Sequence, residues 1–597
     1  MILQRLAEYY DRVTADPKTS DALPKPGYSS QKISFCVVLN LDGSLHQIET
    51  MMVPAGKRTI PQMKLVPGQG KPSGSGINPC FLWDNSAYML GYRLDDEKPD
   101  RTVEAFEAFR DRHLALEKEI DSDRFRAVCA FLRNWSPEKA KERATEINDM
   151  IGSFGVFRLA GEQQFVHDDP AVVTYWLQQS QADGEAVRGL CLVTGTEQPI
   201  ARLHEPKIKG VREAQSSGAL LVSFNSDAYT SFGKDQSYNA PVGETSVFKY
   251  ANALNYLLSR EDRRTFLGDA TVVSWADKPT EDAEAISCFI ASQTFAGEDA
   301  SAEDKTRVRQ VQNFLQQLRE GYAGHEAVPA PHPDKPEDEI PFYILGLSPN
   351  ASRISVRFWI PSTIGQMKER LGNHMRDIEL VGASPESPLT IRRIVLATGR
   401  AEKDPKGNVK SYDADSISPQ LSGAISRSIL TGSDYPQMLL GAMLNRMKAD
   451  GAINHPRVAT IKAILICNSN KEISVALDTE RKDPAYVVGR LFALLEKIQT
   501  DSADGNLNTT IKDRYFSAAS ATPGVVFPRL IRLSQHHLAK LDDGIKIFYD
   551  KKLSEVMNKL NGFAPHFTLE NQGLFAVGYY HQRQDLYTKK NKEGASE

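Results

Sequence analysis

The chain has 597 residues, of which 41% are hydrophobic and 25% are charged, and its formal net charge at pH 7 is −4. These values are ordinary for a globular protein, but the length exceeds what one hydrophobic core serves, so roughly three or four domains are expected. No apolar run approaches the roughly 18 residues of a membrane span, and the opening MILQRLAEYYDRV lacks the apolar core of a signal peptide. Any site for a polyanion must therefore be a local basic surface, and no membrane partner is expected.

Cysteine usage indicates a reducing compartment. The six cysteines lie far apart, without a CxxC pair or a short metal-ligand spacing. We therefore expect reduced, mostly buried thiols, a cytoplasmic protein, and neither a metal site nor a cofactor. They are Cys36, Cys80, Cys129, Cys191, Cys288 and Cys467.

The N-terminal region begins with a predicted amphipathic helix over residues 1–13. The segment KISFCVVLNL at 32–41 predicts a strand, and LDGS at 41–44 predicts a turn into a second strand near 46–50. Together these segments predict a β-hairpin.

A glycine-rich loop follows at 66–91, with the sequence VPGQGKPSGSGINPCFLWDNSAYMLG. Its glycines permit close approach of the backbone to a partner. No GK[ST] follows at the spacing of a Walker phosphate loop, so that motif is excluded. A flexible surface loop remains an open alternative, and the aromatic residues Phe81, Trp83 and Tyr88 are expected to lie in the core.

A more basic stretch, CLVTGTEQPIARLHEPKIKGVR, spans residues 191–212. Its cations lie in a segment that Pro206 and Gly210 interrupt, and an extended basic segment suits contacts with phosphates. A solvated charged face explains the same pattern equally well.

The stretch from Ser216 to Leu258 combines three elements. Residues 219–222 predict a short strand, a polar loop rich in Ser, Asn, Gly and Tyr follows, and apolar residues recurring every three positions from Phe248 to Leu257 predict a helix. The loop offers amide side chains, aromatic faces and Lys234, which are groups that hold nucleic acid and contact base edges. An ordinary surface loop is the alternative.

The second half of the chain changes in character. A polar stretch at 296–340 contains a predicted helix and ends in the Pro- and acid-rich AVPAPHPDKPEDE, and two strands are predicted around SPNAS beyond it. Segments 485–499, 525–540, 544–560 and 568–588 all have helical spacing, and residues 481–597 carry about 17 Lys and Arg against about 13 Asp and Glu.

We therefore predict an α+β multidomain protein, with mixed α/β N-terminal and middle regions and an all-α C-terminal helical bundle. The expected segments are an N-terminal α+β domain at 1–325, a linker at 326–340, a middle α+β region at 341–475 and the helical bundle at 476–597.

No sequence pattern makes a convincing active site. The chain lacks GxSxG, HExxH, DFG and the Rossmann glycine fingerprint, and its acidic runs lie in predicted turns or linkers. His536 and His537 are adjacent on a predicted helix, where neighbouring side chains diverge by about 100°, so they do not easily share a metal. We predict no catalytic residues, with a metal-dependent nuclease kept as an alternative.

Several long, irregular strings resemble the large subunit of the type I-C CRISPR surveillance complex, Cascade. They span nearly the whole chain, so the resemblance is more specific than a single glycine-rich loop. The strings are KISFCVVLN, SGSGINPCFLWDNSAYMLG, CLVTGTEQPIARLHEPKIKGV, SGALLVSFNSDAYTSFGKDQSYNAPV, NTTIKDRYFSAASATPGVVFPRLIRLSQHHLAKL and NQGLFAVGYYHQRQDLY.

The resemblance implies a non-enzymatic subunit that recognises the protospacer-adjacent motif in double-stranded DNA. It further implies that the subunit promotes duplex opening and R-loop formation, steadies the displaced strand and helps to recruit a helicase-nuclease. The implied partners are crRNA, target DNA, and the backbone, crRNA-end-processing and small subunits of Cascade. The family also makes its C-terminal module separately as the small subunit, with Met443, Met447 and Val475 as candidate starts here.

No motif of the family assigns the contact residues one by one, so they follow from side-chain chemistry. Asn and Gln suit adenine edges, and Lys suits guanine or phosphate. The candidates at the adjacent motif and the duplex fork are Lys71, Ser73, Ser75, Asn78, Asn225, Ser226, Lys234, Gln236 and Asn239. Those expected to position the DNA backbone are Lys207, Lys209 and Arg212. Those expected to follow single-stranded DNA are Arg490, Lys512, Arg514, Arg529, Arg532 and Lys540. A purely structural scaffold of the ribonucleoprotein is the remaining alternative.

Overall fold

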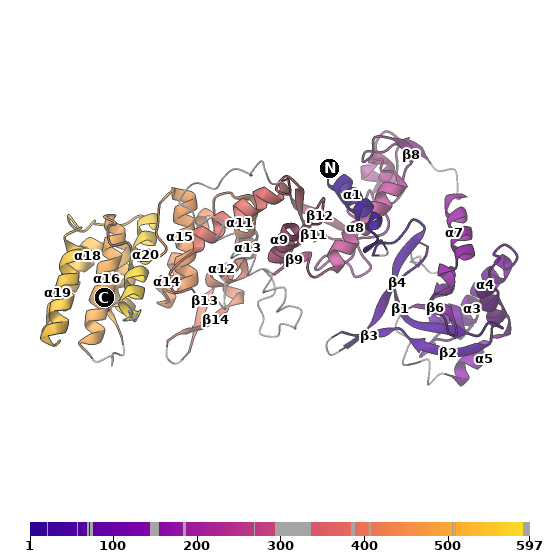
Figure 1. Ribbon diagram of the computed structural model, residues 1–597, viewed down its shortest axis with the longest axis horizontal. Coiled ribbons are helices and arrows are strands. Elements are labelled where there is room, and N and C mark those ends of the chain that lie inside the picture. The colour runs from indigo at the N-terminus through magenta and orange to yellow at the C-terminus, as the bar shows by residue number, and fades with distance from the viewer. Residues whose placement is uncertain are drawn as a thin grey trace, which may run out of the picture. The chain divides into compact units, whose positions relative to one another are not determined.

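The fold is α+β and multidomain, with a helical C-terminal region (Figure 1). Two compact units divide the chain: the first comprises Met1–Ser259 with Pro349–Ser355, and the second comprises Arg260–Ser348 with Val356–Glu597. This computed structural model describes residues 1–20, 22–55, 58–68, 71, 76–143, 148, 154–182, 187–267, 269–292, 336–383, 389–404, 407–503, 507 and 509–588.

A six-stranded sheet forms the centre of the first unit and contains β1 (Tyr28–Leu39), β2 (Leu45–Thr50), β3 (Met52–Ala55), β4 (Arg58–Pro67), β5 (Trp83–Asp84) and β6 (Phe154–Leu159). The order is β3-β4-β1-β6-β5, and β2 pairs with β1 outside that path. Strand β1 runs antiparallel to β2 and β4 and parallel to β6. The β1–β2 pairing confirms the hairpin predicted from the sequence.

Side chains alternate along β1, and both faces of the sheet are buried along this strand. Phe35, Val37 and Leu39 join a core with the adjacent helices, while Cys36 and Val38 lie in the cluster on the opposite face. The aromatic residues Phe81, Trp83 and Tyr88 are also buried, which confirms that expectation. The helices in this part of the first unit are α2 (Ser86–Leu90), α3 (Pro99–Leu116), α4 (Asp123–Asn134), α5 (Pro137–Glu142) and α7 (Pro170–Ala182).

Two helices that are far apart in sequence lie side by side in the first unit, α1 (Ile2–Ala15) and α8 (Glu244–Ser259) (Figure 1). Lys249 of α8 lies 2.7 Å from a carboxylate oxygen of Asp11. The short hairpin of β7 (Arg188–Leu190) and β8 (Glu197–Pro199) precedes the polar loops, and α8 follows them. Helix α8 therefore anchors the polar loop at its C-terminal end.

A second sheet has the strand order β12-β11-β10-β9 and belongs to the second unit, except for the turn between β11 and β12, which counts with the first. Its strands are β9 (Arg264–Leu267), β10 (Ala270–Ala276), β11 (Pro341–Asn350) and β12 (Arg353–Thr363). Strands β10 and β11 pair antiparallel, although the stretch between them includes residues outside the described part of the chain. Residues after 260, which the sequence analysis placed in a domain ending at 325, thus share a sheet with the region after 341. The linker predicted at 326–340 and the preceding helix lie largely outside the described residues.

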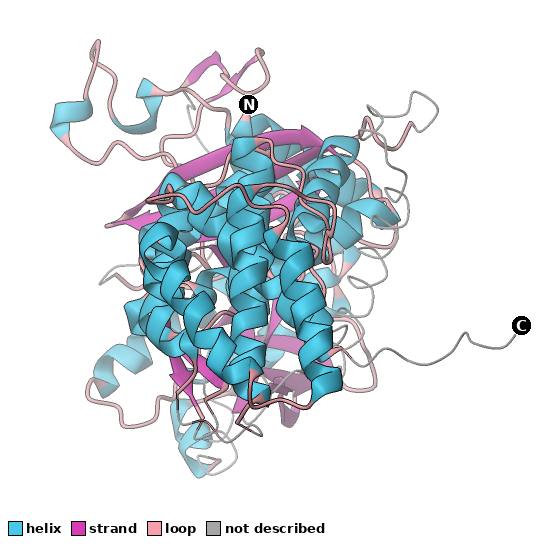
Figure 2. Ribbon diagram, turned by 90° about the vertical axis from the view of Figure 1, so that its left-hand side faces the viewer, coloured by secondary structure: helices cyan, strands magenta, loops and turns pink. Residues whose placement is uncertain are grey.

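The remaining part of the second unit is mainly helical, with one small hairpin of β13 (Arg400–Lys403) and β14 (Val409–Asp413). The four helical segments predicted near the C-terminus are confirmed as α16, α18, α19 and α20, labelled in Figure 1, and α17 was not predicted. Figure 2 looks onto this end of the chain, and the ribbons nearest the viewer are helices. The helices are α9 (Glu281–Ser292), α11 (Ile364–Ile378), α12 (Ile391–Ala397), α13 (Pro419–Thr431), α14 (Gln437–Asp450), α15 (His455–Ser469), α16 (Pro484–Asp501), α17 (Ile511–Ala521), α18 (Pro523–Leu538), α19 (Asp543–Met557) and α20 (Leu569–Tyr587).

Two glycines allow α16 and α20 to approach closely. A Cβ at Gly489 would collide with the main-chain oxygen of Phe575, and a Cβ at Gly578 would collide with that of Tyr486. Main-chain atoms on both sides leave no flexible side chain to move away, so these helices pack backbone against backbone. This crossing fixes the centre of the C-terminal bundle.

Candidate nucleic-acid interface

The polar loop predicted between the strand and the helix is exposed along residues 225–235. We call residues 224–239 the tip loop. At its end Ser231 and Lys234 face each other across a two-residue turn, in which the Lys234 N–H donates to the Ser231 oxygen at 3.0 Å. Phe232 and Gly233 both have positive φ, +50° and +68°, as a type I′ turn requires. The Phe232 side chain is 99% exposed.

The strand predicted at 219–222, just before this loop, is wrong. Only isolated bridges form there, from Ala219 to Ile208 and from Leu220 to Arg353. Apolar composition suggested a strand, but no neighbouring strand extends the pairing beyond single residues. The segment therefore enters the tip loop as irregular backbone joined at separate points.

Asn239 holds the tip loop in shape from within. Its side-chain oxygen accepts from the Ser231 N–H at 3.1 Å, and its amide nitrogen donates to the carbonyl oxygens of Lys234 and Gln236 at 2.7 and 3.0 Å. Gln236 is half-buried and accepts from Arg202 at 2.9 Å. Both amides, which were expected to contact bases, have internal partners here. Base contact by either side chain stays a prediction.

The exposed candidates of this loop are Asn225, Ser226 and Lys234. The Ser226 hydroxyl accepts from the Ala228 N–H at 3.4 Å, whereas no hydrogen bond or ion pair engages the Lys234 ammonium among the described residues. Nearby, a guanidinium nitrogen of Arg353 donates to the Tyr229 hydroxyl at 2.9 Å, and the guanidinium carbon lies 5.0 Å from the centre of that ring. Lys234 is thus the cation of the tip loop that is free to meet a ligand.

The basic segment at 205–212 is attached to α8 by its backbone. Asn255 accepts from the Lys209 N–H at 2.8 Å and donates to the Lys207 oxygen at 3.0 Å. The pKa of Lys209 is lowered, first by burial and then by the positive charges of Lys32 on β1 and of Lys207. Arg212 is exposed and lies 3.6 Å from Glu213. The fold thus gathers Lys32, Lys207 and Lys209, and like charges held together suit a phosphate.

Lys71 of the glycine-rich loop has a role inside the protein. Its ammonium forms an ion pair with Asp84, donates to the Asn78 oxygen at 2.9 Å and lies 3.3 Å from the centre of the Tyr88 ring. Asp84 is fully buried, and that burial raises the pKa of its carboxyl. The need to neutralise this buried carboxylate explains a lysine at position 71 without any contact with DNA. Asn78 is exposed, and Ser73 and Ser75 lie outside the described residues.

In the C-terminal bundle, Arg490 differs from the other candidates because it is only 4% exposed. Its guanidinium donates to Gln582 at 3.1 Å and to the oxygens of Asp478 and Thr479 at 3.4 and 3.3 Å. The prediction that Arg490 lies on a surface that follows DNA is therefore wrong, because helical spacing placed it on the inner face of α16.

The other cations of this bundle lie at the surface. Arg529 and Arg532 are exposed on α18, with Lys540 in the turn after it, and we call these three the cation stripe. Arg514 is exposed on α17, which packs against α18, and Lys512 is half-buried beside Asp513 at 3.6 Å. Positions 529 and 532 are three residues apart on α18, so their charges lie on one side of the helix.

A comparison of the whole chain with known families supplies the identity. A sequence model of the CRISPR-associated protein family Csd1 matches residues 6–587. The chain belongs to the Csd1 family. This family is that of the type I-C large subunit, so the Csd1 protein is a component of a Cascade complex with other Cas proteins. A search of curated proteins found no match to this chain.

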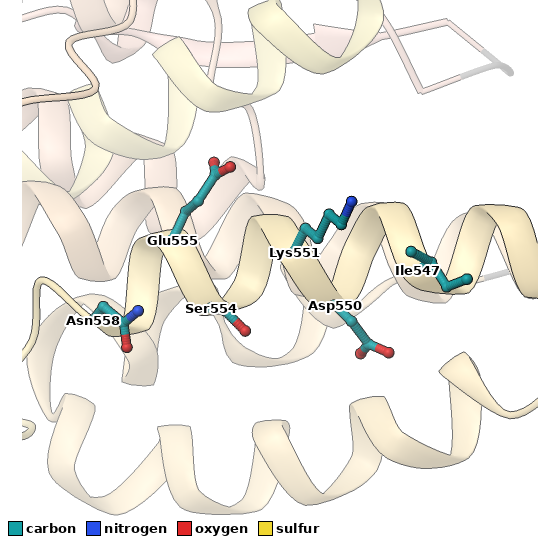
Figure 3. Close-up of a pocket in the computed structure, with 6 residues that line it drawn as sticks. All are labelled: Ile547, Asp550, Lys551, Ser554, Glu555 and Asn558. Atoms are coloured by element: carbon teal, nitrogen blue, oxygen red, sulfur yellow. The ribbon is translucent and has the colours of Figure 1, made fainter.

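The surface of α19 in the Csd1 protein carries a shallow groove with a different character from the cation stripe (Figure 3). Its lining side chains carry both signs of charge, so the groove offers no net attraction for a polyanion. They are Ile547, Asp550, Lys551, Ser554, Glu555 and Asn558.

Among the described residues, no group of at least three His, Cys, Asp or Glu side chains is placed to hold a metal ion. None of the helices described in the Csd1 protein has the length and apolar character to cross a membrane.

Sequence reasoning missed three residues that lie at the candidate interface: Lys32, Phe232 and Arg353. Lys32 and Arg353 come from strands remote in sequence, so only the fold places them beside the loops. The sequence did contain a signal for Phe232. In SFGK the pair Phe-Gly is flanked by polar residues, which is typical of a tight turn with an exposed tip.

Proposed function

We propose that this chain is the non-catalytic subunit of Cascade that recognises the protospacer-adjacent motif in double-stranded DNA, in the cytoplasm. In this role it promotes duplex opening and R-loop formation, steadies the displaced strand and helps to recruit the helicase-nuclease. Its partners are crRNA, target duplex and displaced strand, and the backbone, crRNA-end-processing and small subunits. In RNA-guided recognition base pairing reads the sequence, so the protein needs only a small groove-reading element and phosphate contacts.

The observation that carries this proposal is the tip loop, whose backbone is held by Asn239 while Lys234 is exposed and free. A preorganised loop loses little entropy on binding, and a free lysine suits guanine or phosphate. The Lys32, Lys207 and Lys209 group supports the proposal with a phosphate contact in the same unit. The cation stripe supports a contact with the displaced strand.

The test uses the assembled complex with its guide RNA. Lys234→Ala and Gln236→Ala should each lower affinity for duplexes carrying the adjacent motif by roughly tenfold, with less effect on duplexes lacking it. Lys546→Ala is the matched control, because Lys546 is an exposed lysine on α19. Unchanged binding by both tip-loop variants across several salt concentrations would overturn the role of this loop.

Two other functions give different results. A nuclease would cut labelled DNA in the presence of divalent metals, and a carboxylate substitution would abolish the cutting. A structural scaffold would improve assembly of the complex and leave discrimination of the adjacent motif unchanged when the chain is altered.

A further inference from the structure

Phe232 occupies a position that folding does not explain. Its ring is 99% exposed, so it buries no apolar surface within the chain. Its φ of +50° is one that side chains other than glycine, asparagine and aspartate rarely adopt. An aromatic residue at an unfavourable backbone position, with no compensating contact, points to a function outside the folded chain.

The surroundings of Phe232 favour a nucleobase as its ligand. Lys234, Arg202 and Arg353 supply positive charge near the loop, and Asp227 and Asp235 offset part of it, so this is not a simple phosphate track. An interface for a protein partner generally has several apolar side chains around its centre. The exposed stretch 225–235 carries two aromatic rings, Phe232 and Tyr229 at 40% exposure, among side chains that are otherwise polar or small.

The loop also holds the backbone that carries the ring in place before any ligand arrives. The turn that bears Phe232 is closed by the Ser231–Lys234 bond and fixed by Asn239. Arg353 holds Tyr229 at the base of the same loop. A backbone that is already ordered loses little conformational freedom when the ring that it carries stacks.

We infer that the ring of Phe232 stacks on an unpaired nucleobase at the edge of the duplex that the tip loop meets. This inference rests on the proposed function and adds to it the chemical group that the loop binds. Stacking on an aromatic ring tolerates any base, because every base has a π-face. The contact therefore supplies affinity at the opened junction and leaves discrimination of the motif to other groups.

Photo-cross-linking locates the base. Target duplexes carry 5-iodouracil at one position at a time around the adjacent motif, and the complex is irradiated and analysed by mass spectrometry. We expect an adduct on the peptide containing Phe232 at one or two neighbouring positions. Phe232→Leu, which keeps an apolar side chain without a π-face, should abolish it.

A double-mutant cycle then measures the contact. On normal DNA, Phe232→Ala should weaken binding by roughly tenfold, and Phe232→Trp should retain it. With an abasic site at the cross-linked position, Phe232→Ala should have no further effect, because the base that it would stack on is gone. Phe548→Ala is the matched control, since Phe548 is an exposed phenylalanine on α19 at 47%.

Three results would overturn the inference. One is an additive cycle, and another is the absence of any Phe232 adduct together with unchanged binding by Phe232→Ala. The third is loss of assembly by Phe232→Ala without DNA, which would place the ring in a protein pocket. The proposed function fails separately, if the wild-type complex binds duplexes with and without the motif equally well.

Discussion

The tip loop and the cation stripe both present positive charge, but they hold it by different means. In the tip loop, hydrogen bonds from one amide side chain, Asn239, fix the backbone that carries Phe232 and Lys234. In the bundle, the helix itself places Arg529 and Arg532, and the close crossing of α16 and α20 supports it. A loop of this kind is sensitive to single substitutions, whereas charges along a helix contribute one by one.

The largest effect is expected for a lysine that resembles Lys234 in sequence but not in environment. Lys71→Ala leaves the buried Asp84 carboxylate without its partner, so the first unit should lose about 3 kcal/mol of unfolding free energy. Urea denaturation measures the loss, and adding Asp84→Asn should restore part of it. Lys234→Ala should change stability by less than about 0.5 kcal/mol. A stable Lys71→Ala protein with weakened DNA binding would contradict this difference.

The next prediction tests whether the close packing of α16 against α20 determines the stability of the bundle. Gly489→Ala puts a methyl group against the main chain of α20 and should cost about 2–3 kcal/mol, measured by urea or thermal unfolding. Gly441→Ala on α14 is the control, because nothing lies within 4 Å of its added Cβ, and it should be neutral or slightly stabilising. Equal stabilities of the two variants would mean that the crossing of α16 and α20 is looser than described.

Acid should weaken both units through buried histidines. Burial lowers the pKa of His204 in the first unit and of His374 and His581 in the second to about 4, and each ring bonds to a tyrosine hydroxyl. Their pKa in the unfolded chain is about 6.5, so between pH 6.5 and pH 4 the unfolded state binds more protons. The contribution of each neutral histidine to the free energy of unfolding is fully present above pH 6.5. It decreases as the pH falls, and at pH 5 the loss is about 2 kcal/mol for each histidine.

Thermal melting from pH 7.5 to pH 5 measures this dependence. His374→Gln should lower stability at pH 7.5 and flatten the decline below it, because glutamine has no proton to gain. A decline of equal steepness in the variant would assign the acid sensitivity to other groups.

The smallest effects are expected for the cation stripe. Arg529→Ala and Arg532→Ala should each reduce the salt dependence of single-strand binding by about 0.7 in the logarithmic slope, and together by about twice that. Arg490→Gln should instead lower stability and leave the slope unchanged, because its guanidinium is buried. A slope that responds to Arg490 and not to the stripe would reverse the interpretation.

The periodicity of apolar residues predicted helices and strands better than it predicted irregular segments. The β1–β2 hairpin, the strands β11 and β12, and four of the C-terminal helices follow from alternation or helical spacing. The strand predicted at 219–222 failed because a strand needs a partner in register, which local composition does not reveal. The sharing of one sheet by residues before and after the stretch at 293–335 is equally a matter of tertiary pairing.

For the candidate interface, the sequence indicated the segments better than the residues. Residue type alone did not separate Lys71 and Arg490, which have internal partners, from Lys234 and Arg529, which are exposed. Asn239, for which contact with a base stays a prediction, also supports a turn, because an amide bonds to a backbone as readily as to a base edge. The exposure of a side chain and its hydrogen-bond partners depend on the residues that folding brings next to it.

The close crossing of α16 and α20 also has a consequence for how this sequence can diverge. Each glycine faces the main chain of the other helix, so a larger residue at either position would require the helices to move apart. A relative that carries alanine at one of them should therefore show compensating changes along the whole contact. Residues of α16 and α20 along this contact should then change together among relatives, although the two helices are far apart in sequence.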